Sequence, residues 1–339
     1  MFDFIPDYVF LLVFGFLLLI KGGDWFVDAA TGIAKRFKLP ELLIGATVVS
    51  IGTTLPEVMT SAMGAMADSG AIAYGNAIGS IICNTSLIAA LTIAIKPGKV
   101  DKKALLFPVC AFFAVAALYS VIAYTAGTFA RWTGIVLLCL FVIYMVVNVI
   151  NMKRNPVADE DEADEALECE LPESGSKFGL IKDIGVLIGS ALVIALGADL
   201  LVESATTIAH ELHVPETIIS LTIVALGTSL PELVTAITAL TKGHGALSLG
   251  NIIGANIFNL VLVSGAAITI SPFDVPTSAT FLDMNASFVF DIPLMIGVMA
   301  LLTVPSLIRG KLARWQGVSL LLLYVGYCVL QFVLIPMFP

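Results

Sequence analysis

The feature that most constrains this chain is a pair of motifs that occurs twice. Residues 50–57 read SIGTTLPE, and residues 225–232, 175 positions later, read ALGTSLPE. A second motif repeats at the same offset, because residues 75–80 read GNAIGS and residues 250–255 read GNIIGA. Two motifs that keep the same separation indicate an internal repeat, so the fold has to accommodate each motif twice.

Both motifs lie in long apolar sequence, which determines the environment in which the chain can fold. Hydrophobic residues make up 58% of the 339 residues, and charged residues only 13%. A water-soluble protein of this length cannot bury so much apolar surface, so we expect an integral membrane protein. The five cysteines have no paired spacing, and four lie in apolar segments, where a thiol usually packs as a small hydrophobic side chain.

The apolar sequence divides into ten stretches that are each long enough to cross a bilayer. About 20 helical residues span a hydrocarbon core about 30 Å thick. Pro, Gly or charged residues separate the stretches, as expected at helix ends. The stretches are residues 7–33, 40–66, 70–95, 103–125, 129–152, 179–208, 215–241, 245–271, 285–307 and 314–336. We therefore expect an all-α fold with ten transmembrane helices.

One long polar segment, residues 153–177, separates the first five stretches from the last five. It contains nine Asp and Glu residues between Asp159 and Glu173, equal to the net charge of −9 of the whole chain. Such a composition does not form a packed core, so we expect a solvated linker rather than a regulatory calcium site. The predicted organisation is a five-helix repeat at 1–152, this linker, and a second five-helix repeat at 178–339.

Lysine and arginine are distributed very unevenly between the two sides of the predicted membrane. If both termini lie outside, 15 of the 17 basic residues fall at the inner loops, leaving Arg131 on the outer side and Lys21 within the first helix. Basic residues accumulate on the cytoplasmic side, so this orientation is favoured and the linker is cytoplasmic. The two repeats then enter the membrane from opposite sides, and this inverted symmetry brings the duplicated motifs together near the midplane.

Each copy of the first motif combines a proline with oxygen-bearing residues. Pro56 and Pro231 lack an N–H and clash with the carbonyl four residues earlier, so we expect the helix to bend or break before each proline. Main-chain carbonyls freed in this way need another partner in lipid, and a cation can serve. Further oxygens come from side chains at equivalent positions of the two copies, which are Thr53, Thr54 and Glu57, and Thr228, Ser229 and Glu232.

The two glutamates are costly in a membrane unless something compensates their charge. An acid at mid-membrane costs about 2.5–3.5 kcal/mol, so Glu57 and Glu232 together cost about 5–7 kcal/mol. No Lys or Arg lies within either motif helix to pair with them. A divalent cation offsets both charges, and a donor set made only of oxygen favours Na⁺, Ca²⁺ or Mg²⁺ over transition metals. Mg²⁺ fits less well than Ca²⁺, because it demands a rigid octahedron.

Other polar residues also repeat. Asn84 and Asn259 follow Asn76 and Asn251 by eight residues, about two turns along the same helix face, and we interpret Asn84 and Asn259 as cation ligands. For Asn76 and Asn251, the sequence is compatible both with cation binding and with helix packing.

Asp24 and Asp199 form a third repeated pair, in the first and sixth predicted helices. One interpretation is a residue at an ion entrance or gate. The other, which we favour, is a polar anchor where a tilted helix meets the membrane interface.

The paired motifs resemble the two alpha-repeats of the cation/calcium exchanger superfamily, and the chain is most similar to its prokaryotic sodium/calcium exchangers. This resemblance implies a central Ca²⁺ site made by the two glutamates and the carbonyls of the motif threonines. It also implies flanking Na⁺ sites made by hydroxyls, main-chain carbonyls and serines, and a gate formed by the first and sixth helices. Position by position, it implicates Ser50, Thr53, Thr54, Glu57, Ser80, Asn84, Ala225, Thr228, Ser229, Glu232 and Asn259.

Two positions depart from the family's pattern. Asn259 stands where better-known members carry aspartate, and Ala255 stands where they carry the serine equivalent to Ser80. The first change leaves two carboxylates, which balance the charge of one Ca²⁺. The second removes a hydroxyl and should weaken one outer Na⁺ site. The potassium-dependent branch keeps the aspartate, so coupling to K⁺ is not expected.

We therefore expect a secondary active antiporter, not an enzyme, that exports Ca²⁺ in exchange for inward Na⁺ by alternating access. One alternative is an H⁺/Ca²⁺ antiporter, although proton-coupled members usually carry a GN-type motif before the glutamate. A cation channel is a further alternative, which an inverted repeat disfavours because it suits alternating access. The expected partners are inorganic cations and the lipid of a prokaryotic plasma membrane, without a cofactor, nucleic acid or obligate protein partner.

Overall fold

The computed structural model describes residues 7–154, 177–211, 225–277, 280–281 and 284–331. In these ranges the chain is helical apart from two short antiparallel strand pairs. The all-α prediction is confirmed. The strand pairs are β1 (Thr128–Phe129) with β2 (Phe273–Asp274), and β3 (Thr280–Phe281) with β4 (Met284–Asn285).

Eight helical segments of the described residues are long and apolar enough to cross a membrane. They are Tyr8–Phe37, Glu41–Met66, Gly70–Ile95, Lys102–Ala126, Arg131–Asn151, Leu180–Ser204, Gly245–Ile270 and Ser287–Arg309. The seventh predicted stretch is described only in part, where α11 (Leu230–Thr241) is apolar but short. The tenth contains α15 (Arg314–Val329). A total of ten membrane helices therefore stays a prediction, as does the conformation of the acidic linker, which lies outside the described residues.

The chain forms two compact units, and each unit combines residues from both halves of the sequence. The first unit comprises Met1–Thr53 and Val147–Asn251, and the second comprises Thr54–Val146 and Ile252–Pro339. The duplicated motifs are thus divided between units at Thr53 and at Asn251, inside helices that continue across each boundary.

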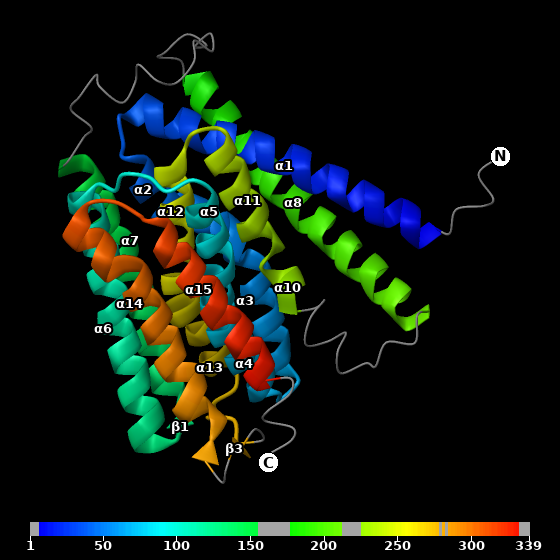
Figure 1. Cartoon of the computed structure of the whole chain (residues 1–339), viewed down its shortest axis with the longest axis vertical. Coiled ribbons are helices and arrows are strands. Elements are labelled where there is room, and N and C mark those ends of the chain that lie inside the picture. The colour runs from blue at the N-terminus through cyan, green and yellow to red at the C-terminus, as the bar shows by residue number, and fades with distance from the viewer. Residues whose placement is uncertain (1–6, 155–176, 212–224, 278–279, 282–283, 332–339) are drawn as a thin grey trace. The chain divides into compact units, whose positions relative to one another are not determined.

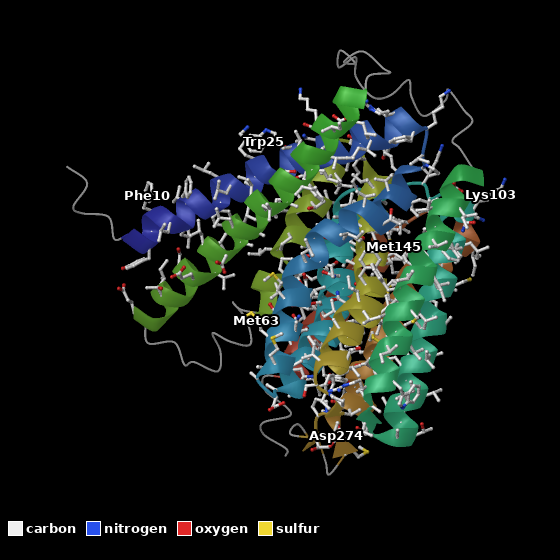
Figure 2. All side chains as sticks on the ribbon, turned by 180° about the vertical axis from the view of Figure 1, so that it is seen from behind. Phe10, Trp25, Met63, Lys103, Met145 and Asp274 are labelled. Carbon is white, nitrogen blue, oxygen red and sulfur yellow. The ribbon has the colours of Figure 1, made fainter. Side chains whose placement is uncertain are left out.

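The first unit contains a pair of long helices, α1 (Asp7–Phe37) and α8 (Lys177–Glu211), which run side by side (Figure 1). A Cβ atom on Gly15 would lie only 2.9 Å from the carbonyl oxygen of Gly197, so the two backbones touch where both helices carry glycine. Other side chains of α1, such as Phe10 and Trp25, point away from the helix pair and are exposed (Figure 2). Exposed apolar side chains of this size are expected on a surface that faces lipid.

The second unit contains α5 (Ala90–Ile95), α6 (Lys102–Ala126), α14 (Ile292–Arg309) and α15, together with the first helix of the second motif and the part of its second helix from Ile252 onward. α15 packs against α5, and the buried Gln316 of α15 donates hydrogen bonds to carbonyls of α14. α7 (Arg131–Arg154) passes from this unit into the first.

The duplicated second motif folds into duplicated helices. α4 (Gly70–Cys83) and α12 (Gly245–Phe258) begin and end at equivalent positions of the two copies. Each continues into a π-helical turn that begins at the predicted asparagine ligand, Asn84–Ala89 (η2) or Asn259–Val263 (η4), before α5 and α13 (Ser264–Ile270). Such turns are rare and occur frequently at functional sites. The repeat is therefore a repeat of structure as well as of sequence.

Candidate cation site

The first copy of the proline motif lies on α3 (Ser50–Met66), which runs through Pro56 without interruption. Of the predicted bend or break, the break is therefore absent from this copy. The altered hydrogen bonding lies one turn earlier, where Gly45–Val49 (η1) follows α2 (Glu41–Ile44) as a π-helical turn. The hydroxyl of Ser50 donates to the carbonyl of Gly45 at 2.7 Å, which satisfies a carbonyl of that turn.

The second copy does contain the predicted break. α10 (Ala225–Thr228) ends before Ser229, whose φ of −93° and ψ of 6° are not helical, and α11 then begins at Leu230. Pro231 occupies the first turn of α11, where a missing N–H costs no helical hydrogen bond. Glu232 lies in the same turn, and the positive end of the helix dipole stabilises a negative charge there.

Both predicted charge-bearing ligands are completely buried. Glu57 and Glu232 each have 0% exposed surface. In the second unit, the amide of Asn76 donates to the main-chain carbonyl of Glu57 at 3.1 Å and to the hydroxyl of Ser61 at 2.9 Å. Asn76 thus fixes the backbone of Glu57 through a side chain of α4. For Asn76, the structure therefore shows the packing role that the sequence allowed.

Four predicted ligands carry buried polar atoms that have no hydrogen-bond partner among the described residues. They are Thr54 and Ser229, which are equivalent, and Asn84 and Asn259, which are also equivalent. None is more than 2% exposed. A buried polar atom without a partner costs about 1–3 kcal/mol, so a protein rarely retains the same cost at equivalent positions of a repeat without a use for it. Hydroxyl and amide oxygens of this kind are suitable ligands for Na⁺ and Ca²⁺.

The remaining predicted ligands are distributed over both units. Ser50 and Thr53 lie in the first unit and are buried, as is Ser80 in the second, where its helix α4 packs against η4 and therefore against the turn that starts at Asn259. Thr228 is half-buried at the end of α10, and Ala225 begins that helix.

Asn251, for which the sequence left cation binding and helix packing open, contacts two of the predicted ligands. Its side-chain oxygen accepts a hydrogen bond from the hydroxyl of Thr53 at 3.2 Å. The same oxygen lies 3.2 Å from the hydroxyl of Ser50, whose one proton has the nearer carbonyl of Gly45 as its main acceptor. The main-chain carbonyl of Asn251 also lies 2.9 Å from the Ser50 hydroxyl. The only signal in the sequence was the equivalence of Asn251 with Asn76, which does not distinguish packing from a role at the site.

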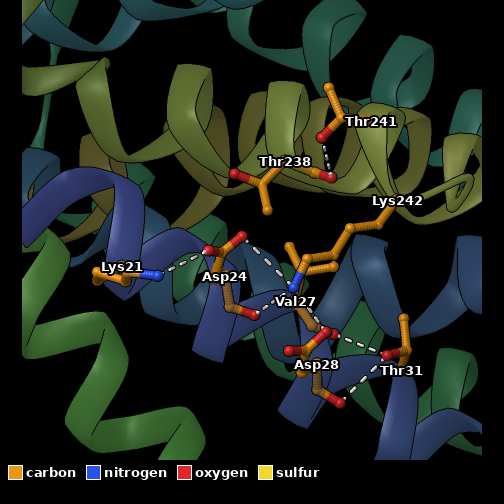
Figure 3. A network of polar contacts seen from close by, with 8 residues as sticks. All are labelled: Lys21, Asp24, Val27, Asp28, Thr31, Thr238, Thr241 and Lys242. Atoms are coloured by element: carbon orange, nitrogen blue, oxygen red, sulfur yellow. Dashed lines mark hydrogen bonds and ion pairs between the residues drawn. The ribbon is translucent and has the colours of Figure 1, made fainter. Parts of the chain in front are cut away.

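Asp24 lies on α1 in a network of charged side chains (Figure 3). The ammonium of Lys242, at the end of α11, lies 3.5 Å from the Asp24 carboxylate and 2.7 Å from that of Asp28. Lys21 is 4.0 Å from Asp24 on the same helix. The equivalent Asp199 is exposed on α8. An exposed or base-paired carboxylate agrees better with the anchor interpretation than with a buried cation ligand.

Comparison with known proteins places these features in one family. The sodium/calcium exchanger protein family matches residues 8–150 and 182–333. The sodium/calcium exchanger MaX1 of Methanosarcina acetivorans is 31% identical over 349 residues, which cover 95% of this chain and 97% of MaX1. The putative antiporter CaxA of Alkalimonas amylolytica is 35% identical over 329 residues, which cover 96% and 98% of the two chains.

A solved structure of the sodium-calcium exchanger NCX_Mj, soaked with Na⁺ and Ca²⁺, is similar to the structure of this chain, with a TM-score of 0.79 at 30% sequence identity. The match covers 97% of this chain and 99% of the other. The family match extends over both repeats, and the relatives match along nearly their whole length. This protein therefore belongs to the sodium/calcium exchanger family, and it is a multi-pass membrane transporter rather than an enzyme.

Proposed function

We propose that this protein is a secondary active antiporter that exchanges Ca²⁺ for Na⁺ by alternating access. The observation that carries the proposal is the duplicated set of buried oxygen donors that have no hydrogen-bond partner among the described residues, at Thr54 and Ser229 and at Asn84 and Asn259. The names of the relatives support Na⁺ and Ca²⁺ as the transported ions.

In this proposal, Glu57 and Glu232 bind one Ca²⁺ together. Their two charges compensate one divalent ion, and their complete burial explains why an uncompensated pair would be unstable. The carbonyls of Thr53 and Thr228 add neutral oxygens, and Asn84 and Asn259 complete the polar surroundings. Ca²⁺ takes about six to eight oxygen ligands in flexible geometries, which suits a site of mixed carboxylate, carbonyl and amide donors.

Na⁺ then binds at the neutral donors around the glutamates. We assign Ser50, Thr54 and Ser80 to this role in the first copy, and Ser229 with the carbonyl of Ala225 in the second. Ala255, which is fully buried, carries a methyl group where Ser80 has a hydroxyl. The second copy therefore offers one fewer oxygen, and we propose that its outer Na⁺ site is the weaker of the two.

We propose that the two halves, residues 1–152 and 178–339, form inverted five-helix repeats with both termini outside. The matched bounds of α4 and α12, and the equivalent residues at which the following turns begin, support the duplication. The distribution of Lys and Arg supports the orientation and a cytoplasmic linker, in a prokaryotic plasma membrane. Asp24 and Asp199 serve as polar anchors of the helices that gate access.

Transport into proteoliposomes tests this function directly. Purified protein is reconstituted into vesicles loaded with Na⁺, and uptake of radioactive Ca²⁺ is measured after dilution into Na⁺-free buffer, with protein-free vesicles as the control. We expect uptake that requires the Na⁺ gradient and that a pH gradient of equal size does not replace.

Uptake driven by the pH gradient without Na⁺ would instead identify an H⁺/Ca²⁺ antiporter. Ca²⁺ flux that needs no counter-ion would identify a channel.

A further inference from the structure

Asn251 lies where the backbone of α12 touches the segment that precedes the first motif. A Cβ atom on Gly250 would be 2.0 Å from the carbonyl oxygen of Leu42, and one on Gly45 would be 2.7 Å from the main-chain nitrogen of Asn251. No residue larger than glycine fits at either position without displacing the backbone of the neighbouring segment. These two glycines therefore hold Asn251 at a fixed place relative to η1 and to the start of α3. All of these residues belong to the first unit.

From this place, the side chain of Asn251 accepts a hydrogen bond from the hydroxyl of Thr53, a residue that we assign to the cation site, and lies beside the hydroxyl of Ser50. Its oxygen Oδ1 is 3.2 Å from Thr53 Oγ1 and 3.2 Å from Ser50 Oγ. A hydroxyl has one proton and two lone pairs, so a hydroxyl that donates to Asn251 directs its lone pairs elsewhere. Its oxygen is then available to a cation. An amide provides this acceptor without adding a charge to a buried site.

The amide nitrogen of the repeated asparagine has different surroundings in the two copies. In the first copy, the Asn76 amide nitrogen donates to the hydroxyl of Ser61 at 2.9 Å. The residue equivalent to Ser61 is Ala236, which is fully buried and has no hydroxyl. Within the described part of the chain, Asn251 Nδ2 is buried and has no hydrogen-bond partner. Asn251 therefore makes a side-chain hydrogen bond through its amide oxygen, whereas Asn76 makes side-chain hydrogen bonds through its amide nitrogen.

We propose that Asn251 is a positioning residue for Na⁺ binding, which sets the hydroxyl orientation of Thr53 beside the neutral oxygen donors of the first copy. The inference rests on the proposed exchange of Na⁺ for Ca²⁺. Its effect should fall mainly on Na⁺, because Na⁺ depends on neutral oxygens, whereas Ca²⁺ is held mainly by the charge of two carboxylates.

The first test compares Asn251→Ala with Ser248→Ala in proteoliposomes. Ser248 is a matched control, because it is buried on the same helix one turn earlier and its hydroxyl has no hydrogen-bond partner in the described ranges. Two quantities are measured for each variant: the Na⁺ concentration for half-maximal exchange, and the Ca²⁺ affinity of the purified protein without Na⁺. We expect Asn251→Ala to raise the first by about three- to tenfold, as for the loss of one hydrogen bond. The Ca²⁺ affinity should change by less than about twofold, and Ser248→Ala should alter neither.

Several results would overturn the proposal while leaving the exchange function intact. One is an unchanged Na⁺ dependence in Asn251→Ala, and another is an equal loss of Na⁺ and Ca²⁺ affinity, which indicates a purely structural role. The exchange function itself fails in a different way, because wild-type protein would then show no Na⁺ dependence at all.

Ala236→Ser provides a second variant that does not depend on the folding of Asn251→Ala. It restores the hydroxyl that the first copy has at Ser61, and so offers Asn251 Nδ2 an acceptor. A better-fixed amide should lower the Na⁺ concentration for half-maximal exchange by about two- to threefold without changing Ca²⁺ affinity. An unchanged or higher Na⁺ requirement in Ala236→Ser would contradict the proposal.

Discussion

The two copies of the proline motif have nearly the same sequence and different backbones. In the first copy, α3 continues through Pro56, whereas in the second the helix stops at Ser229 and restarts at Leu230. The two copies differ in sequence at their first position, which is Ser50 in the first copy and Ala225 in the second. Ser50 donates a hydrogen bond to Gly45 and so stabilises the π-helical turn that leads into α3. Its equivalent, Ala225, has no hydroxyl to do this.

This comparison shows that a proline in a membrane helix does not by itself determine a break. Proline removes one hydrogen bond and adds one steric clash, and the chain can accommodate both in two ways. A wider turn upstream keeps the helix continuous, or a new helix begins with proline in its first turn. Because a new helix begins in the second copy, Glu232 lies in the first turn of α11, whereas Glu57 lies in the interior of α3.

The largest expected effect tests whether the two copies are equally necessary despite this difference. We predict that Glu57→Gln and Glu232→Gln each reduce Na⁺-dependent Ca²⁺ uptake at least about 100-fold. Either change leaves one carboxylate for a buried divalent ion, a loss of about 3 kcal/mol or more. Glu203→Gln, at an exposed position on α8, is the control and should transport normally. Near-normal uptake by one of the two variants would show that only one copy binds Ca²⁺.

The next prediction concerns stability, and it tests the close backbone contact between Gly250 and Leu42 in the first unit. We predict that Gly250→Ala lowers the free energy of unfolding by about 1–3 kcal/mol, because its methyl group would meet the Leu42 backbone. Thermal unfolding in detergent measures the change, and Gly189→Ala, on an exposed face of α8 with no atom within 4 Å in the described residues, is the control. Equal melting temperatures for the two variants would argue against the contact.

A smaller effect should separate the repeated aspartates. We predict that Asp24→Asn slows exchange by about twofold or less, because it removes a half-exposed ion pair with Lys242, and such pairs contribute about 0–1 kcal/mol. Asp199→Asn should have no effect, since Asp199 makes no ion pair with the described residues. Measured exchange rates for both variants test this. A loss of more than about tenfold in either would support a gating role instead of an anchor.

The smallest effect is expected in the acidic linker. We predict that replacing residues 159–173 with a flexible neutral segment keeps most of the exchange rate, because the segment lacks the apolar residues for a packed core. Initial Ca²⁺ uptake of this variant, compared with wild type over a range of cytoplasmic-side Ca²⁺ concentrations, provides the measurement. Loss of activation by Ca²⁺ would show that the linker is regulatory.

The sequence predicted the class of fold and the identity of the buried polar residues, because both depend on local properties. Long apolar stretches indicate a membrane, and a duplicated glutamate without a nearby base predicts a cation site. The sequence did not predict that the two copies differ, with α3 continuous through Pro56 and a break at Ser229, since both copies carry the same proline. The π-helical turns at Asn84 and Asn259 have no recognisable sequence signal.

The sequence also did not predict contacts between segments that are far apart along the chain. The position of Asn251 depends on the backbone contact between Gly250 and Leu42. Lys242 meets Asp24 only because α11 packs against α1. Such contacts follow from tertiary packing, which a pattern of residue types does not specify.

Equilibrium Ca²⁺ binding to the purified protein tests the central claim most directly, which is that the two different copies serve one ion. Titration calorimetry without Na⁺ gives the number of Ca²⁺ ions bound per chain. The account predicts one Ca²⁺ per chain in the wild type and the loss of that binding in both Glu57→Gln and Glu232→Gln. Two Ca²⁺ per chain in the wild type, with each variant retaining one, would contradict it, because each copy would then form a site of its own.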